Sequence, residues 1–466
     1  MKFSQWAWMS AGVVVAALAF GKFASAQSQA STQMGAAKSP SASKVTGRVY
    51  HVSPTGSDTA NGSKSSPWKT IQKAADTMTT GDRVMIAAGV YRQRVVAKKS
   101  GTAGRPISYI GAKGAIIDGL DLPERGVFNT NGQSYLTIRG LKVQNGMPQG
   151  QGISVIGSKN VRVERCHTFD TADSGIHVDY SAQVSVLNNE VEKGCQRGGE
   201  ETISIKRSEY VEVNYNHIHH TGHEGIDVKE GARHVRVIGN NIHHVDRQGL
   251  YVDAWNQQTF DVRFINNVVH DCGFGFVMAS EMGGLLKDIW FVNNLIYNNR
   301  GPGMGIPRWG EDGKSDDGKT NVTPGPGYVS KRDLYFINNT IVNNGNPGSS
   351  WGGGMYFETD IADNVVVKNN ILSGNSGAPI LSRDGKRPPN AIIMNNLLFG
   401  KGNTDQPGVG NVTGDPLFVD AAKGDFRLRA GSPAINAGAS GNVPVRDKAG
   451  RLRDARPDIG AFEHVG

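Results

Sequence analysis

The sequence predicts an all-β protein, a right-handed parallel β-helix (a solenoid) with a short N-terminal capping helix. The first observation is that short β-branched runs ending in Asn-Asn recur at a near-constant spacing, which is typical of a repeat architecture. The second is that 61 of the 466 residues are glycine, as expected for many short strands joined by turns. The third is the combination of 20% charged with 38% hydrophobic residues, which favours a folded chain over a disordered one.

The first residues have the pattern of an export signal. Lys2 supplies a positive charge, residues 11–20 form a short apolar run, and Ala24-Ser25-Ala26 has the pattern of a cleavage site. We therefore expect a signal peptide over residues 1–26 and a secreted or periplasmic protein. Residues 27–47 are rich in Ser, Ala, Gln and Lys and are expected to be a disordered linker. No segment approaches the roughly 20 apolar residues of a membrane-spanning helix, so we expect no membrane span.

A short helix is predicted near the start of the ordered region. Ser66 is a plausible N-cap and Pro67 suits the first turn, because proline needs no hydrogen-bond partner there. Apolar side chains then fall on one face of the helix. They are Trp68, Ile71, Ala74 and Ala75. In a β-helix such a helix would close the open end of the core.

The repeat consists of coils that end in a pair of residues. The pairs are Asn188-Asn189, Tyr215-Asn216, Asn240-Asn241, Asn266-Asn267, Asn293-Asn294, Asn338-Asn339, Asn369-Asn370 and Asn395-Asn396. Between the second residues of these pairs the steps are 27, 25, 26, 27, 45, 31 and 26 residues. Asparagine tolerates left-handed backbone at a turn, and stacked side-chain amides can bond from coil to coil. We interpret the second residues as an Asn ladder that is part of the scaffold.

These repeats define the domain organisation. The β-helix with its N-terminal cap is predicted over residues 48–413. The 45-residue step contains a segment rich in Gly, Pro, Asp and Lys, which is predicted to be an inserted loop over residues 301–328. Residues 414–466 lose the period and are predicted to be a tail of strands and loops that packs on the helix.

Three sequence patterns carry a resemblance to a known group of proteins. They are the N-terminal pattern at residues 52–58, Gly-Asp-Pro-Leu-Phe at residues 414–418, and Asp-Ile-Gly-Ala-Phe-Glu at residues 458–463. In these patterns the chain resembles exported bacterial right-handed parallel β-helix proteins of the pectate-lyase-like superfamily. The resemblance implies the fold, but such proteins have varied activities, so function has to be argued from the site.

A second set of strands aligns upstream of the paired residues. Alternate residues of a strand point to opposite faces, so the polar residues of these strands point outward and stack in columns roughly 4.8 Å apart. One column is His177, Ser204, Asp227, Tyr251 and Val277. The next column is Asp179, Lys206, Lys229, Asp253 and Ala279. We expect these side chains to face solvent along one groove.

Acidic residues precede these strands on successive coils. They are Asp173, Glu200, Glu201 and Glu224. Carboxylates that converge from neighbouring coils suit a hard cation, so calcium is the expected cofactor, with Glu201, Glu224 and Asp227 as its ligands.

The strand pattern with its acids resembles the active region of β-helix polysaccharide lyases of the chondroitinase B and alginate lyase type. The resemblance implies that Lys206 is the base and that Lys229 is the second basic residue, at a position where the family normally has Arg. It also implies that calcium neutralises the carboxylate of the substrate. The base must be uncharged to accept a proton, and a neighbouring cation disfavours its charged form and lowers its pKa.

Other residues suit substrate binding. The predicted set is His177, Asp179, Tyr251, Asp253, Trp255 and Arg308, and Trp309 could add to an aromatic wall for sugar rings. The net charge of +8 favours an anionic partner. We expect an acidic polysaccharide and no nucleic acid, because no nucleic-acid-binding motif is present. We expect a monomer.

Histidines and cysteines form no metal motif that the spacing identifies. The histidines are His217, His219, His220, His223, His243, His244 and His270, which we interpret as stacked turn residues; a zinc site would need partners that the sequence does not identify. The three cysteines, Cys166, Cys195 and Cys272, are expected to be buried thiols.

The function predicted from these observations is a secreted polysaccharide lyase that cleaves an acidic, uronate-containing polymer by β-elimination. A uronate epimerase would share the proton abstraction. A glycoside hydrolase is an alternative, for which Asp227, Asp253 and Glu201 could supply the acid and the base or nucleophile. A non-catalytic carbohydrate-binding surface protein is a further alternative.

Overall fold

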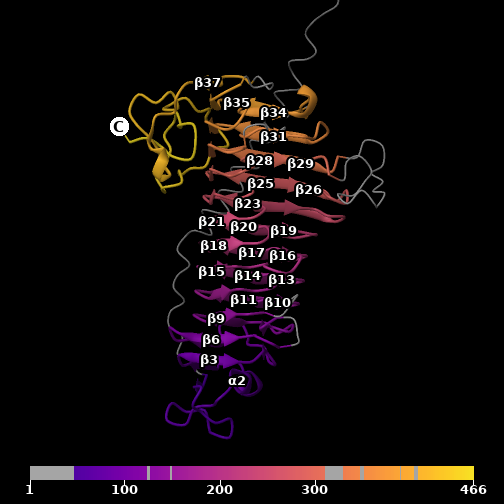
Figure 1. Cartoon of the computed structure of the whole chain (residues 1–466), viewed down its shortest axis with the longest axis vertical. Coiled ribbons are helices and arrows are strands. Elements are labelled where there is room, and N and C mark those ends of the chain that lie inside the picture. The colour runs from indigo at the N-terminus through magenta and orange to yellow at the C-terminus, as the bar shows by residue number, and fades with distance from the viewer. Residues whose placement is uncertain are drawn as a thin grey trace, which may run out of the picture.

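The computed structural model describes residues 47–122, 126–146, 150–309, 329–346, 351–388, 390–402 and 408–465. In this part of the chain, successive coils stack along one long axis, and their strands form three parallel sheets (Figure 1). The predicted all-β, right-handed parallel β-helix with a short capping helix is therefore confirmed. The predicted signal peptide, and the predicted linker apart from Gly47, lie outside the described residues.

Each coil contributes one strand to each sheet, in the chain order sheet 1, sheet 3, sheet 2. Sheet 1 contains β1 (Val49–Val52), β2 (Arg83–Ile86), β5 (Ile107–Gly111), β8 (Leu136–Arg139), β11 (Lys159–Glu164), β14 (Ala182–Leu187), β17 (Glu209–Asn214), β20 (Arg233–Ile238), β23 (Gln258–Ile265), β26 (Leu285–Val292), β29 (Lys331–Ile337), β32 (Asp363–Lys368) and β35 (Ile392–Met394).

Sheet 2 contains β4 (Val95–Val96), β7 (Phe128–Asn129), β10 (Ile153–Ile156), β13 (Ile176–Asp179), β16 (Ile203–Lys206), β19 (Ile226–Lys229), β22 (Gln248–Asp253), β25 (Phe274–Ala279), β28 (Met304–Ile306), β31 (Met355–Phe357) and β34 (Ile380–Ser382).

Sheet 3 contains β3 (Gly89–Arg92), β6 (Ala115–Asp118), β9 (Lys142–Gln144), β12 (His167–Phe169), β15 (Glu190–Glu192), β18 (His217–Thr221), β21 (Asn241–Val245), β24 (Val268–His270), β27 (Leu295–Tyr297), β30 (Thr340–Val342), β33 (Ile371–Ser373), β36 (Leu397–Phe399) and β37 (Val412–Thr413). The inward residues of the three sheets form one continuous apolar core.

The capping helix is α2 (Ile71–Thr77), and it closes the N-terminal end of the core with Ile71, Ala74 and Ala75. Its N-cap is Thr70, whose hydroxyl accepts a hydrogen bond from Lys73 N at 3.1 Å. The predicted cap at Ser66 and first turn at Pro67 are therefore wrong. The reason is that Trp68 is extended beside β1, where it donates to His51 O and accepts from Ser53 N, so the helix begins later.

The predicted Asn ladder runs through the turns between sheets 1 and 3. In each step the Oδ1 atom of one Asn accepts from the backbone N and the Nδ2 atom of the Asn one coil earlier, as Asn267 does from Asn240 at 3.0 and 2.9 Å. The ladder is Asn189, Asn216, Asn240, Asn267, Asn294, Asn339, Asn370, Asn396 and Asn411. Because the amides from Asn189 to Asn396 are buried and bonded within the chain, these residues are scaffold.

One rung of the ladder differs from the prediction. The buried member of its pair is Asn240, and Asn241 is exposed as the first residue of β21. In the other coils the first residue of the pair has a left-handed backbone, with φ of 54° at Asn188 and 59° at Asn266. Gly239 takes that position with φ of 68°, which moves the ladder residue one place earlier.

A second, shorter ladder lies in the turns between sheets 3 and 2. Asn299, Asn344 and Asn375 are bonded in the same manner, at 2.8 and 3.0 Å between side chains. At its head, Cys272 N donates to Asn299 Oδ1 at 2.9 Å. Cys166, Cys195 and Cys272 are buried free thiols, as predicted.

The predicted inserted loop is partly a strand. Residues 304–306 form β28 and pair with β25 and β31, so the prediction of a loop over all of residues 301–328 is wrong for them. Residues 310–328 lie outside the described residues. After β31 and β34, a single short turn, η1 (Arg383–Gly385), extends from the end of sheet 2.

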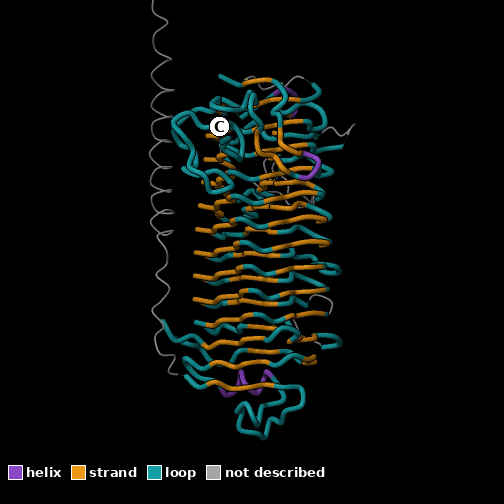
Figure 2. Tube along the Cα trace, turned by 90° about the vertical axis from the view of Figure 1, so that its left-hand side faces the viewer, coloured by secondary structure: helices purple, strands orange, loops and turns teal. Residues whose placement is uncertain are grey.

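The C-terminal segment lies beside the last coils, next to sheet 3 (Figures 1 and 2). It contains the antiparallel pair β38 (Phe418–Asp420) and β39 (Asp425–Leu428), joined through η2 (Ala421–Lys423). Its apolar residues pack on outward residues of sheet 3. The contact includes Phe418, Phe426, Leu428, Ala434, Ile459 and Ala461 against Leu295, Val342 and Ile371.

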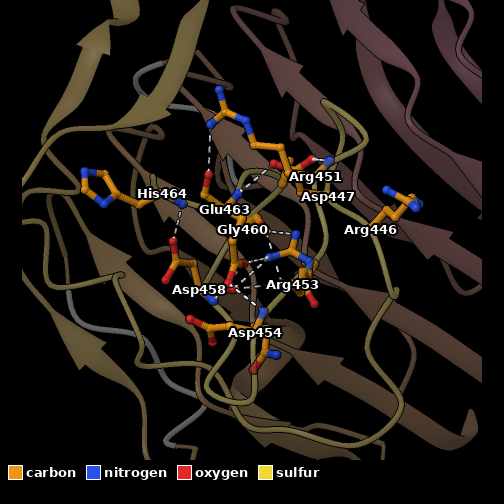
Figure 3. Close-up of polar contacts among 12 residues, drawn as sticks. Arg446, Asp447, Arg451, Arg453, Asp454, Asp458, Gly460, Glu463 and His464 are labelled. Atoms are coloured by element: carbon orange, nitrogen blue, oxygen red, sulfur yellow. Dashed lines mark hydrogen bonds and ion pairs between the residues drawn. The ribbon is translucent and has the colours of Figure 1, made fainter. Parts of the chain in front are cut away.

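A buried ion pair organises this segment (Figure 3). Arg453 donates to Glu463 Oε2 at 2.9 Å, to Gly460 O at 2.8 Å and to Asn293 Oδ1 at 3.0 Å. The last contact joins the segment to a turn of the solenoid. Asn338 makes a similar link through its Nδ2 atom, which donates to Asp458 O at 3.0 Å.

Candidate functional site

The two predicted columns are present on the outer face of sheet 2. The register pairs His177, Ser204, Asp227, Tyr251 and Val277 on successive strands. It also pairs Asp179, Lys206, Lys229, Asp253 and Ala279. The apolar residues between them fill the core, so alternation along the strands was sufficient to predict which side chains meet.

The expectation that these columns face solvent is wrong for most of them. Asp227 is only 1% exposed, Asp253 2% and Tyr251 5%, because side chains from the segments flanking the strands cover them. Glu201 from the preceding turn accepts from Ser204 Oγ at 2.9 Å, and Glu281 accepts a hydrogen bond from the Tyr251 hydroxyl. The outer face is therefore a filled polar layer.

The two stacked lysines are separated by carboxylates. Lys206 Nζ lies 3.0 Å from Glu230 Oε1 and 3.3 Å from Glu200 Oε1. Lys229 Nζ lies 2.6 Å from Glu201 Oε1 and 3.3 Å from Glu200 Oε2. Glu200 thus bridges the two lysines and offsets the repulsion between them.

The carboxylates determine the charge state of Lys229. Burial alone would disfavour its charged form, but Glu201, Asp227 and Glu200 outweigh burial and raise the pKa of Lys229. The expectation that a neighbouring cation lowers the pKa of these lysines is therefore wrong for Lys229. This residue stays protonated at neutral pH, which suits it to hold a negative charge and not to accept a proton.

Several acids have the opposite shift. Burial, reinforced by Glu201, raises the pKa of Asp227 well above its usual range. Burial and the charge of Glu281 raise the pKa of Asp253 to about 8. Burial also raises the pKa of Glu224 and of Asp173. The layer contains more carboxyl groups than basic groups, so some of them have to bind a proton or a cation.

The predicted calcium ligands fit a cation in part. Within the described part of the chain, both oxygens of Asp227 and Oε2 of Glu224 are buried without a hydrogen-bond partner, so they are available to a hard cation. Glu201 uses one oxygen for Lys229 and the other for Ser204. A cation held by Glu201, Glu224 and Asp227 would have to displace Lys229 from Glu201, and calcium stays a prediction.

The predicted binding residues divide into two locations. Asp179 accepts from Arg207 Nε at 2.9 Å and Nη2 at 2.6 Å, and His177 Nε2 lies 3.9 Å from Asp179 Oδ2. Burial opposes ionisation of Asp179, but His177 and Arg207 hold its pKa at about 2. Trp255 is exposed beside the end of β22. Arg308 lies beyond β28, where its backbone N donates to Glu358 at 3.2 Å.

Sequence reasoning found Glu200 and Glu201 but missed two other charged residues beside the lysines. Arg207 and Glu230 directly follow the last residues of β16 and β19, at positive φ of 44° and 50°. Arg207 also lies over the ring of Tyr180, which holds the same position one coil earlier, at 4.2 Å. This shared position after the strand is the signal that could have identified them.

An aromatic pocket lies further along the same sheet. Tyr356 and Leu381 continue the column of Tyr251 and Val277 through Gly305. With neighbouring residues they line a pocket of about 400 Å³. The lining is Trp351, Tyr356, Glu358, Leu381, Ser382, Arg383 and Asp384. Trp309 lies 6.3 Å from Trp351 between ring centroids, so the predicted aromatic wall has a partner that the sequence did not indicate.

The histidine runs lie on sheet 3 and not beside the lysines. His217, His219, His243 and His270 lie in strands, so their interpretation as turn residues is wrong. His220 and His244 also lie in these strands, where their backbone is left-handed with φ of 56° and 52°. The predicted stacking is confirmed, for example between His219 and His243 with ring planes 8° apart. Burial and neighbouring histidines lower the pKa of His243 to about 4.

Family models and known proteins identify the class. A model described as the Pel9A-like right-handed beta helix region matches residues 50–196. A model described as the right-handed beta helix region matches residues 197–313 and 230–416. Together with the solenoid seen here, these matches show that the chain belongs to the right-handed β-helix proteins of the pectate-lyase-like superfamily.

Individual relatives are distant. The chain is 24% identical over 457 residues to the uncharacterized protein YwoF of Bacillus subtilis (strain 168), covering 83% of this chain and 92% of that protein. It is similar to the structure of XylC with xylose (TM-score 0.57, 13% identity, 90% and 98% covered). It is also similar to pectate lyase Pel9A (TM-score 0.50, 18% identity, 90% and 96% covered). At these identities the structural likenesses show the fold.

The described residues contain no helix with the length and apolar character needed to cross a membrane.

Proposed function

We propose that the chain is a secreted polysaccharide-degrading enzyme, a lyase that cleaves a uronate-containing polymer by β-elimination on sheet 2. The observation that carries this proposal is the pair of stacked lysines with different environments. Lys229 is held by Glu201 at 2.6 Å and stays charged, while Lys206 has longer contacts of 3.0 and 3.3 Å. We therefore assign the role of base to Lys206, whose contacts are the longer ones.

The division of roles follows from these contacts. As the base, Lys206 accepts the proton on C5, beside the uronate carboxylate, and the electron pair of that C–H bond forms the C4=C5 double bond. The C4–O bond breaks, and the oxygen leaves with the electron pair of that bond and takes up a proton from water. Charged Lys229 stabilises the negative charge that develops on the carboxylate, which lowers the barrier because that charge grows in the transition state.

Calcium bound through Asp227 and Glu224 would supply further positive charge at the substrate carboxylate. Two other observations support a sugar polymer. The net charge of +8 attracts polyanions over long range. The pocket around Trp351 and Tyr356 offers flat apolar faces on the same sheet, with Glu358 and Arg383 for hydroxyl groups.

Hydrolysis is a second candidate that one observation favours. Asp253, with its pKa raised to about 8, carries a proton at neutral pH, as a general acid must. The burial of Asp253 opposes this role, because a substrate could reach it only after the groups that cover it move.

Incubation of the protein with a panel of uronate polymers, with and without calcium, tests the proposal. We expect ultraviolet absorbance from the unsaturated product, and loss of that signal in Lys206→Ala but not in the control Lys159→Ala, whose lysine is exposed on β11. New reducing ends without absorbance would support hydrolysis instead. Absence of both signals with all polymers would overturn the proposed activity.

A further inference from the structure

The outer face of sheet 3 has a cluster of imidazoles around one carboxylate. Glu190 of β15 pairs with His217 of β18 in one column. His219 of β18 pairs with His243 of β21 in the next column. Three consecutive coils therefore bring these four side chains together, on a different sheet from the lysines.

The ligand-type atoms of the cluster converge. One carboxylate oxygen of Glu190 and one ring nitrogen each from His217 and His219 lie within 4.8 Å of one another. His219 Nε2 is 3.4 Å from Glu190 Oε1. His217 Nε2 is 2.8 Å from His243 Nε2, so His243 adjoins this group of three at His217, although its ligand atoms do not lie within 4.8 Å of all three.

Two neighbouring histidines orient these rings. His219 Nδ1 lies 2.9 Å from His220 Nδ1, and His243 Nδ1 lies 2.8 Å from His244 Nδ1. Because each Nδ1 atom is engaged by the next residue of the same strand, the Nε2 atoms of His219 and His243 are left to face the cluster. A second partner that fixes the ring and frees one nitrogen is the usual arrangement around metal-binding histidines.

We propose that Glu190, His217, His219 and His243 form a binding site for one divalent transition-metal ion of the zinc type. Three imidazoles and one carboxylate suit such an ion, whereas calcium takes oxygen ligands. Around a tetrahedral ion with bonds of about 2.0–2.1 Å, two nitrogens lie about 3.3 Å apart. For His243 to join the other three, its contact with His217 has to open by about half an ångström and its ring has to turn toward His219 and Glu190.

Bound there, the ion would link β15, β18 and β21 across three coils. The inference does not depend on the lyase proposal, because the two groups of residues share no side chain. His270 provides a matched control. It stacks on His243 with ring centroids 5.0 Å apart, but its Nδ1 atom contacts Asp271 at 2.6 Å and it is outside the converging group.

Titration calorimetry of the chelator-treated protein, free of any histidine tag, tests the site with ZnCl₂ alone. We expect one ion per chain and a rise in the melting temperature on binding. The double variant His217→Ala/His243→Ala should weaken binding at least 100-fold and abolish the rise, while His270→Ala should bind as the parent does. Circular dichroism of the metal-free variants would show that they fold.

Three results would overturn the inference. The first is that the parent protein binds no zinc at micromolar concentrations. The second is that the folded double variant binds as the parent does. The third is that binding depends on the neighbouring group His167, Glu190 and Glu192, with loss in His167→Ala/Glu192→Gln and none in His243→Ala.

Discussion

The outer faces of sheets 2 and 3 are built on the same coils but carry different chemistry. On sheet 2, acids and bases from neighbouring coils pair within the layer, as Lys229 does with Glu201 and Arg207 with Asp179. On sheet 3, imidazoles stack on one another and meet nitrogen to nitrogen, as His217 and His243 do. The comparison teaches that the same stacking geometry gives the first face ion pairs with an excess of carboxyl groups and the second face ring nitrogens with electron pairs to share.

The largest expected effect is on the reaction rate, which should depend on sheet 2 and not on sheet 3. Lys206→Ala on sheet 2 should lower the rate on a uronate polymer about 100-fold or more, which is the contribution of a proton-transfer group. His243→Ala on sheet 3 should leave that rate within about twofold of the parent, because the two faces share no residue. Initial rates of absorbance increase measure both. Equal losses in the two variants would break the distinction between the faces.

The second prediction compares the faces by stability. Lys229→Met removes the partner of buried Glu201 and should lower the free energy of unfolding by about 3 kcal/mol. His243→Ala leaves no buried charge and should cost about 1 kcal/mol. Urea unfolding at pH 7 in a chelator measures both.

The control for this second prediction is Lys423→Met. It removes an exposed ion pair of similar length, 2.8 Å to Asp420, and should change stability by less than about 1 kcal/mol. A loss as large as that of Lys229→Met would show that burial is not what makes the sheet 2 pairs costly to break.

The third prediction concerns the scaffold that both faces share. Asn240→Ala leaves the backbone N of Asn216 and the carbonyl of Val213 without their side-chain partner, and should cost about 2–3 kcal/mol. Asn241→Ala, at an exposed site, should cost less than about 0.5 kcal/mol. The same urea experiment distinguishes them, and a larger loss for Asn241→Ala would reverse the assignment of the ladder.

The smallest expected effect is a difference in pH dependence. The pKa of Asp253 is raised from its ordinary 3.8 to about 8, so its stabilising contribution is complete below pH 4 and is lost as pH rises to 8. The pKa of His243 is lowered from 6.5 to about 4, so stability is lost as pH falls from 6.5 to 4.

Melting temperatures of two variants in a chelator test these opposite slopes. The melting temperature of Asp253→Asn should exceed that of the parent by a few degrees at pH 8 but not at pH 4. The melting temperature of His243→Gln should exceed that of the parent at pH 4 but not at pH 8. Parallel curves for parent and variants across this range would contradict both shifts.

The fold and the columns on sheet 2 could be predicted because period and alternation are local properties of the sequence. The burial of those columns could not, because it depends on where Glu201 and Glu281 turn their side chains. The charge state of Lys229 could not be predicted either, because it depends on the same side-chain contacts. The functional roles of Lys206, Lys229 and the substrate-binding residues stay predictions.

The histidine partners illustrate a limit of a different kind. Glu190 follows the ladder residue Asn189 just as His217 follows Asn216, so the repeat itself aligns the two on sheet 3. The separation of 27 residues along the chain hides this pairing from any motif that reads neighbouring positions.

For the start of the helix, extended pairing of Trp68 with β1 prevailed over the local capping signal at Ser66.

The C-terminal segment is bonded to the last coils of the solenoid, which should make them more resistant to force than the first coils. In the last coils the first residue of each Asn pair bonds to this segment, as Asn293 does to Arg446 O, Asn369 to Ala439 O and Asn395 to Ala437 O. Lys448 extends these contacts back to Asn266, and the coils before it stack on their neighbours in the described part of the chain. If the two ends of the solenoid were pulled apart, the coils without contacts to this segment would unfold first, one at a time. Each would release about 9 nm of chain before the coils bonded to the segment unfold.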